Sequence, residues 1–138
     1  MTRKKILVHT HHISTHFTNG LFPAAALMIT LFLYTGDPLF ESTAFHCIAI
    51  GFLGIPFAYL SGVMDWKKRF QGRRTRTFDH KIAFGLLFLI LGAVTFFIRW
   101  SYGEEINAAG AVKLVYVALI YILTGLATYL GHLGSKFI

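Results

Sequence analysis

Long apolar stretches, separated by short polar connections, are the main pattern of this chain. They run from about Phe17 to Thr35, Thr43 to Met64, Lys81 to Trp100 and Ala108 to Leu133. Each has close to the roughly 20 mostly apolar residues that an α helix needs to cross about 30 Å of hydrocarbon. We therefore expect an all-α integral membrane protein, a four-helix transmembrane bundle that forms one domain.

Composition and charge support this prediction. Of the 138 residues, 55% are hydrophobic and 14% are charged, whereas soluble domains carry roughly 25% charged residues. The net charge of +7 does not indicate nucleic-acid binding, because the basic residues lie beside the apolar runs rather than along one polar face. Membrane lipid is the expected surrounding, and nucleic acid is not an expected partner.

The basic residues gather on one side of the predicted bundle. The connection from Trp66 to His80 carries six of them: Lys67, Lys68, Arg69, Arg73, Arg74 and Arg76. The basic amino terminus and Lys136 fall on the same side, since an even number of spans separates them from this connection. Cytoplasmic loops carry an excess of Lys and Arg. We therefore expect both termini in the cytoplasm and the protein in a bacterial inner membrane.

The opposite connections carry carboxylates: Asp37, Glu41, Glu104 and Glu105. Arg99 and Lys113 lie at helix ends on that side and are expected to snorkel or to pair with the glutamates. Glycines recur inside the spans, among them Gly51, Gly54, Gly62, Gly85, Gly92, Gly125 and Gly131. Because small residues let membrane helices approach closely, these positions predict helix–helix contacts.

The sequence carries no recognisable catalytic motif. It has no phosphate loop, dinucleotide fingerprint or nucleophile elbow, and its single cysteine, Cys47, cannot form an intrachain disulfide. The basic start is not followed by an apolar run with a cleavage site, so no removable signal peptide is expected. These features predict a non-catalytic subunit.

Histidine is the candidate for chemistry, because the chain has seven. His9, His11 and His12 precede the first predicted span and are expected in solvent. His16, His80 and His132 come from three different spans and share the cytoplasmic end. A b-type haem needs two imidazoles from facing helices. We therefore predict that His132 binds haem iron together with His16 or His80.

One helical face supports His132 as the first of these ligands. It carries small and polar residues at helical spacing: His132, Thr128, Gly125, Thr124 and Tyr121. Lipid does not favour such a face, so we expect it to point into the bundle, with Gly125 against the porphyrin. Gly20 offers similar room one turn past His16. Cations of the long connection would then pair with the haem propionates.

Two further histidine arrangements are open. His12 and His16 have the i, i+4 spacing of a zinc pair, without a third ligand nearby. His46 begins the second span near the opposite surface, with no second histidine at its depth. It is a candidate contact for a partner or a quinone, or half of a second haem site completed by another chain.

Three short motifs extend over most of the chain. They are a histidine, four residues and His-Phe (His11 to Phe17), Ser-Gly-x-x-Asp-Trp (Ser61 to Trp66) and a Leu-Gly-Gly-like end (Tyr129 to Gly134). In these motifs the sequence resembles a family of small bacterial four-helix membrane proteins described as cytochrome b-like. Thr18 stands where that family has proline, and His132 where it usually has glycine. Asp65 is expected to bond to His16 or His80 and orient its ring.

Together these features predict a b-type cytochrome-like membrane subunit. It would carry electrons between a cytoplasmic-side redox partner and membrane quinone, as a non-catalytic part of a larger complex. Two alternatives stay open: a cofactor-free structural or assembly subunit, and a haem-free quinone-binding module in which a histidine bonds to the quinone carbonyl.

Overall fold

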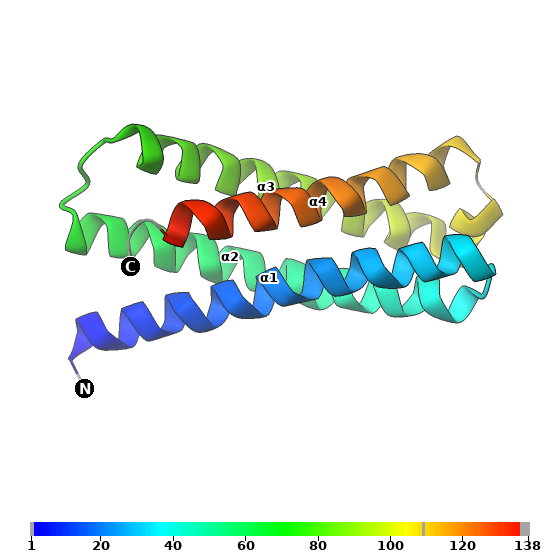
Figure 1. Cartoon of the computed structure of the whole chain (residues 1–138), viewed down its shortest axis with the longest axis horizontal. Coiled ribbons are helices and arrows are strands. Elements are labelled where there is room, and N and C mark those ends of the chain that lie inside the picture. Colours follow the sequence, from blue (N-terminus) through cyan, green and yellow to red (C-terminus); the bar gives the residue numbers. More distant parts are fainter. Residues whose placement is uncertain (1, 109, 136–138) are drawn as a thin grey trace.

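The computed structural model describes residues 2–108 and 110–135. Over these residues the chain forms four α helices, one short 3-10 helix and no strand (Figure 1): α1 (Arg3–Thr35), α2 (Pro38–Arg69), α3 (Arg76–Tyr102), η1 (Gly103–Ala108) and α4 (Ala111–Ser135). Each α helix contains a segment long and apolar enough to cross a membrane. The predicted all-α bundle of four spans is confirmed.

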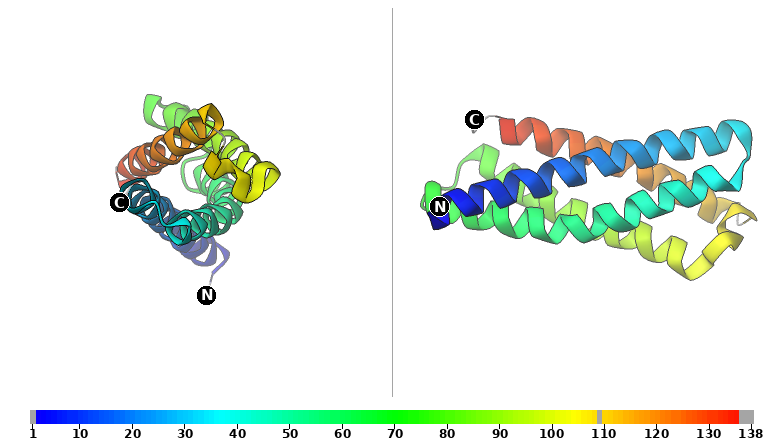
Figure 2. Two further views of the ribbon diagram at one scale, coloured as in Figure 1. Left: turned by 90° about the vertical axis from the view of Figure 1, so that its right-hand side faces the viewer. Right: turned by 90° about the horizontal axis from the view of Figure 1, so that it is seen from below.

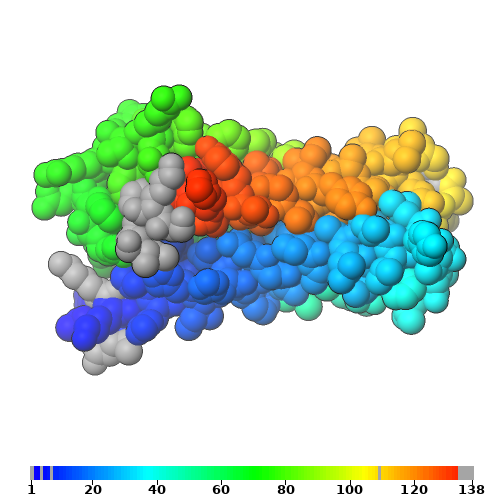
Figure 3. All heavy atoms as spheres, viewed as in Figure 1, coloured from blue at the N-terminus to red at the C-terminus, as the bar shows by residue number. Residues whose placement is uncertain are grey.

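The helices form a closed ring. α1 packs along α2 and α4, and α3 packs along the same two helices, so α1 and α3 lie diagonally opposite (Figure 2). The start of α1, the end of α4 and the connection between α2 and α3 lie together (Figure 1). We call this the basic end, since it holds the cations of residues 67–76. Figure 3 shows α1 and α4 side by side across one face of the molecule.

The turn between α1 and α2 follows from three residues. Gly36 adopts a left-handed conformation, with φ of 74°, and its N–H donates to the carbonyl of Phe32 at 2.7 Å. Asp37 then caps α2 by accepting a hydrogen bond from the Leu39 N–H at 3.0 Å. Pro38 occupies the first helical turn, where its missing N–H costs nothing. This turn stands where the apolar pattern is interrupted.

The helices extend beyond the apolar runs, and α1 does so most. Its 33 residues measure about 50 Å at about 1.5 Å per residue, against about 30 Å of hydrocarbon. With Thr35 at the far surface, the first third of α1 projects past the hydrocarbon at the basic end. The described part of α4 ends short of the start of α1 and the end of α2 (Figure 1).

This extension corrects the prediction for the first histidines. His9, His11 and His12 all belong to α1; His9 and His12 are exposed, as predicted, whereas His11 is half-buried and is the one that was wrongly expected in solvent. The apolar run marks only the part of a helix that meets lipid. The helix continues because its own backbone hydrogen bonds and the packing of α1 on α2 do not require apolar side chains.

Glycines set the close approach of α1 and α2, as the sequence predicts. A Cβ atom at Gly51 would lie 2.9 Å from the ring of Phe22, and one at Gly62 would lie 3.0 Å from the ring of His11. Both distances are too short for two carbon atoms in contact. The phenyl rings of Phe22 and Phe88 meet across the bundle with centroids 5.0 Å apart, in a core that also contains Leu123.

A buried ion pair lies at the opposite end of the bundle. The guanidinium of Arg99 on α3 donates two hydrogen bonds to the carboxylate of Glu41 on α2, one of them 3.0 Å long. Arg99 is 6% exposed and Glu41 is 2% exposed. The guanidinium also lies over the ring of Phe45, 4.8 Å from its centroid. The prediction that Arg99 pairs with a glutamate of this side is confirmed.

Candidate functional site

A cavity of about 370 Å³ opens among the helices at the basic end. Its volume falls within the about 300–1,000 Å³ that is typical of small-molecule sites. Apolar and aromatic side chains form most of its wall. Polar side chains from three helices also line it, including His11, His16 and Thr18 of α1, Asp65 of α2 and Lys81 of α3.

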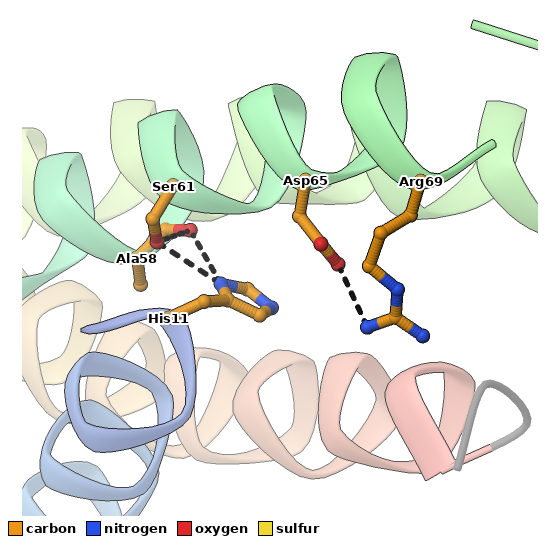
Figure 4. A network of polar contacts seen from close by, with 5 residues as sticks. All are labelled: His11, Ala58, Ser61, Asp65 and Arg69. Carbon is orange, nitrogen blue, oxygen red and sulfur yellow. Dashed lines mark hydrogen bonds and ion pairs between the residues drawn. The ribbon is translucent and has the colours of Figure 1, made fainter. Parts of the chain in front are cut away.

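His11 is held in place by two groups of α2 (Figure 4). Its Nδ1 atom lies 3.2 Å from the carbonyl oxygen of Ala58 and 3.0 Å from the hydroxyl oxygen of Ser61. The Ser61 hydroxyl is also 3.1 Å from the same carbonyl, to which it can donate. Nδ1 can therefore donate to Ala58, or accept from Ser61 if that hydroxyl turns towards it. The choice decides whether Nε2 is an acceptor or a donor.

Two buried polar atoms on the cavity have no hydrogen-bond partner among the described residues. One is Oγ1 of Thr18, a residue that is 2% exposed, and the other is Oδ1 of Asp65. The second carboxylate oxygen of Asp65 accepts from Arg69, with Oδ2 and Nη1 3.3 Å apart. Buried polar atoms are almost always hydrogen-bonded in folded proteins. The Thr18 oxygen lies against Gly54 of α2, 2.7 Å from where a Cβ atom of that glycine would stand, so the side chain belongs to the contact between α1 and α2 as well as to the cavity wall.

The partner of Asp65 differs from the prediction. The prediction is that the carboxylate orients His16 or His80, but it pairs with the guanidinium of Arg69, one turn further along α2 (Figure 4). An i, i+4 pair of opposite charges on one helix forms without any tertiary contact. This local pair holds the carboxylate beside the cavity.

The three predicted haem ligands do not surround one cavity. His16 lines the cavity and is exposed, His80 is half-buried with Nδ1 3.4 Å from the hydroxyl of Tyr129, and His132 is exposed. Of these three histidines, only His16 lines the cavity. Across residues 2–108 and 110–135, no group of three or more His, Cys, Asp or Glu side chains is placed to hold a metal ion.

The orientation predicted for the last helix is wrong. Tyr121, Gly125, Thr128 and His132 are exposed on the outside of α4, and Thr124 is half-buried. The opposite face of α4 is buried and apolar, with Ile120, Leu123 and Ala127 fully covered. The Thr128 hydroxyl donates to the carbonyl of Thr124 at 2.9 Å, within the same helix, so this threonine can face outward at little cost. The hydroxyl of Thr124 lies 3.0 Å from the carbonyl of Ile120 and 3.0 Å from that of Phe22, so this residue borders α1.

Gly20 and His46 are also exposed. A Cβ atom at Gly20 or Gly125 would meet no atom of the described residues within 4 Å, so neither glycine serves a close contact within that part of the chain. The ring of His46 lies 6.0 Å from that of Phe45, and His46 does not line the cavity. The predictions for His46 as a partner, quinone or haem contact stay predictions.

His11 is the residue that the sequence prediction missed. The signal was in the motifs, because the segments His11 to Phe17, Ser61 to Trp66 and Tyr129 to Gly134 all contribute residues to the cavity wall. Ser61 and Gly62 meet the His11 ring directly. Nothing in the sequence alone pairs the first two motifs, which lie about fifty residues apart.

Fold and site together define a multi-pass, four-helix membrane protein with a largely apolar cavity at its basic end that carries a few polar groups. The chain belongs to the family described as "predicted membrane protein (DUF2231)", whose model matches residues 8–137. Among curated proteins and among solved structures, none matches the chain. This family assignment agrees with the sequence-based expectation that the chain belongs to a family of membrane proteins.

Proposed function

We propose that this protein is a quinone-binding, electron-transfer subunit of a membrane oxidoreductase. The observation that carries the proposal is the meeting of three distant sequence motifs at one cavity, with His11 anchored on its wall. A quinone head group is a flat, mostly apolar ring with two carbonyl oxygens. Such a molecule suits a site with apolar walls and a few placed polar groups.

His11 has the hydrogen-bonding range that both forms of a quinone require. When Nδ1 accepts from Ser61, Nε2 carries the hydrogen and can donate to a quinone carbonyl. When Nδ1 donates to Ala58, Nε2 accepts and can take a hydrogen bond from a quinol hydroxyl. Reduction of a quinone takes two electrons, supplied by a redox partner, and two protons. Asp65 and Lys81 line the same cavity and are the further groups that can move protons there.

Haem b is a second candidate, supported by the anchoring of His11. A metal-bound histidine almost always donates its other ring N–H to a carbonyl or carboxylate, as His11 can to Ala58. A haem with two axial imidazoles fits less well, because every histidine on the cavity comes from α1. One helix cannot reach both faces of a flat macrocycle. Haem, when bound, would supply one-electron chemistry, with Lys81 and Arg69 near enough to the cavity for its propionates.

An electron-transfer role requires other subunits. The proposed site lies at one end of the bundle, so a second centre must supply or remove electrons. We therefore propose that the chain works inside an assembly with a redox subunit at its basic end. Copurification in mild detergent, followed by mass measurement, tests this. A monodisperse lone monomer with full redox activity would contradict it.

Tryptophan fluorescence tests quinone binding directly. The chain has two tryptophans, and Trp66 lines the cavity. In a Trp100→Phe background, a short-chain benzoquinone or naphthoquinone is expected to quench Trp66 saturably. His11→Ala should weaken this binding about tenfold, the value of one hydrogen bond to a buried group. Thr18→Val, which removes the hydroxyl of a residue on the cavity wall at nearly constant volume, should weaken it less.

Two controls separate binding from partition into detergent. Tyr34→Phe removes an exposed hydroxyl at the opposite end of α1, away from the residues that line the cavity, and should leave the affinity unchanged. A Trp66→Phe variant, which keeps Trp100, reports quenching by quinone dissolved in the micelle. If quenching of Trp66 follows that of Trp100 and ignores His11→Ala, the quinone proposal is wrong. A reduced-minus-oxidised spectrum of the purified protein decides the haem candidate, and a spectrum without haem bands ends it.

A further inference from the structure

Two exposed histidines on α1 form a pair beside the cavity. His12 and His16 are one turn apart, and their rings are stacked, with centroids 6.5 Å apart and planes 25° apart. Both side chains are exposed, so their rotamers can adjust. Because α1 is helical through this segment, the i, i+4 spacing seen in the sequence places the two imidazole rings next to each other.

The pair is accessible to water as well as to the cavity. About 20 residues of helix cross the hydrocarbon. Counted back from Thr35, they end near His16, which places His12 about 6 Å further out at about 1.5 Å per residue. Both side chains line the cavity. An ion bound between them would therefore sit on the wall of the cavity, at its aqueous end, and take up part of the space that a quinone would use.

We propose that His12 and His16 bind one divalent transition-metal ion, of the zinc and copper class, and that the bound ion closes the cavity to its quinone. The closing role rests on the proposed function, whereas the metal site does not. Zn²⁺ or Cu²⁺ bound by these two histidines would therefore lower the affinity of the cavity for quinone.

The donor set decides the class of metal. Imidazole nitrogen suits Zn²⁺, Cu²⁺ and Ni²⁺, whereas Ca²⁺ and Mg²⁺ prefer oxygen ligands. Two imidazoles at i and i+4 lie on one helix face, as in zinc sites built on helices. Since the described part of the chain places no third ligand with them, water completes the coordination. Such a site binds reversibly, as an inhibitory or sensing ion requires, rather than contributing to folding.

Zinc binding to the full chain tests the site without any quinone. The tag-free protein, stripped with a chelator and held in detergent, competes with a chromophoric chelator for Zn²⁺. We expect one ion per chain, and at least about tenfold weaker binding in His12→Ala and in His16→Ala, as for the loss of any coordinating group. His46→Ala, which removes an exposed histidine of α2, should bind as the wild type. Wild-type protein that binds no Zn²⁺, or single variants that bind it unchanged, would overturn the site.

A second arm tests the closing role. Saturating Zn²⁺ should weaken quinone quenching of Trp66 in the Trp100→Phe background, and His12→Ala should remove this effect of zinc. Quinone binding that ignores bound Zn²⁺ overturns the closing role and leaves the metal site supported. A chain that binds Zn²⁺ but no quinone overturns the proposed function, and the closing role with it. The metal site then still stands on the first arm.

Discussion

Glu41 and Arg99 are the residues whose burial is most costly in this protein. Both are nearly fully covered, and removing charged groups from water is offset only by close pairing and additional contacts. The pair has these, since two hydrogen bonds join the side chains and Phe45 stacks on the guanidinium. Their value to the fold therefore depends on both being present.

Removing one partner should be far worse than removing both. Arg99→Met leaves the Glu41 carboxylate buried without its cation, which should destabilise the protein by about 3–5 kcal/mol. Combining it with Glu41→Leu should recover most of that loss. Thermal melting in detergent, followed by the loss of helical circular dichroism, measures both variants. A double variant as unstable as the single one would show that the pair contributes more than the burial of its own charges.

At the scale of helices, α1 and α2 form the tightest seam, whereas the outer face of α4 is open. Gly51 lies against Phe22, a residue that is fully buried. Gly125 has no atom within 4 Å of the place where a Cβ would stand. Two glycines with the same sequence environment of apolar helix thus have opposite roles in packing.

These two glycines form a matched pair for mutation. Gly51→Ala puts a methyl group 2.9 Å from the Phe22 ring and should cost about 1–3 kcal/mol, because overpacking forces the core to shift. Gly125→Ala meets nothing and should stabilise the helix by up to about 1 kcal/mol. Melting temperatures of both variants in one detergent compare them. Equal effects would mean that α4 packs against a partner through its Gly125 face.

On the scale of the whole molecule, charge divides the bundle into two ends. Six cations lie between residues 67 and 76, next to the start of α1 and the end of α4. The opposite end carries Glu41, Glu104 and Glu105, with Arg99 neutralised by Glu41. From the positive-inside rule, we predict that the basic end is the cytoplasmic one.

Reporter fusions test this orientation. An enzyme that is active only in the cytoplasm, fused after Ile138, should be active. The same reporter inserted between Gly36 and Asp37, in the turn at the other end, should be silent. Stable expression of both fusions, checked by immunoblot, is the control. The reverse pattern would contradict the orientation and place the cavity on the outer side of the membrane.

The number of spans and the uneven charge could be read from the sequence because both are local properties. A helix needs about 20 apolar residues wherever it crosses the hydrocarbon. The Lys and Arg residues of a connection can be counted without knowing how the helices pack. The break at Gly36 to Pro38 is local too. The pairing of His11 with Ser61 is not, because two helices must pack in one register before the groups meet.

By itself, the sequence therefore determined that the chain forms four membrane helices, where they break and which end is basic. Only the tertiary structure decided which face of each helix points inward, and so which histidines reach the cavity. The physical reason is that lipid is as apolar as a helix core. In water, an amphipathic stripe marks the buried face, but in a membrane both faces carry Leu, Ile and Phe. The small polar stripe that ends at His132 thus faces out, and His11, at the start of α1, faces in.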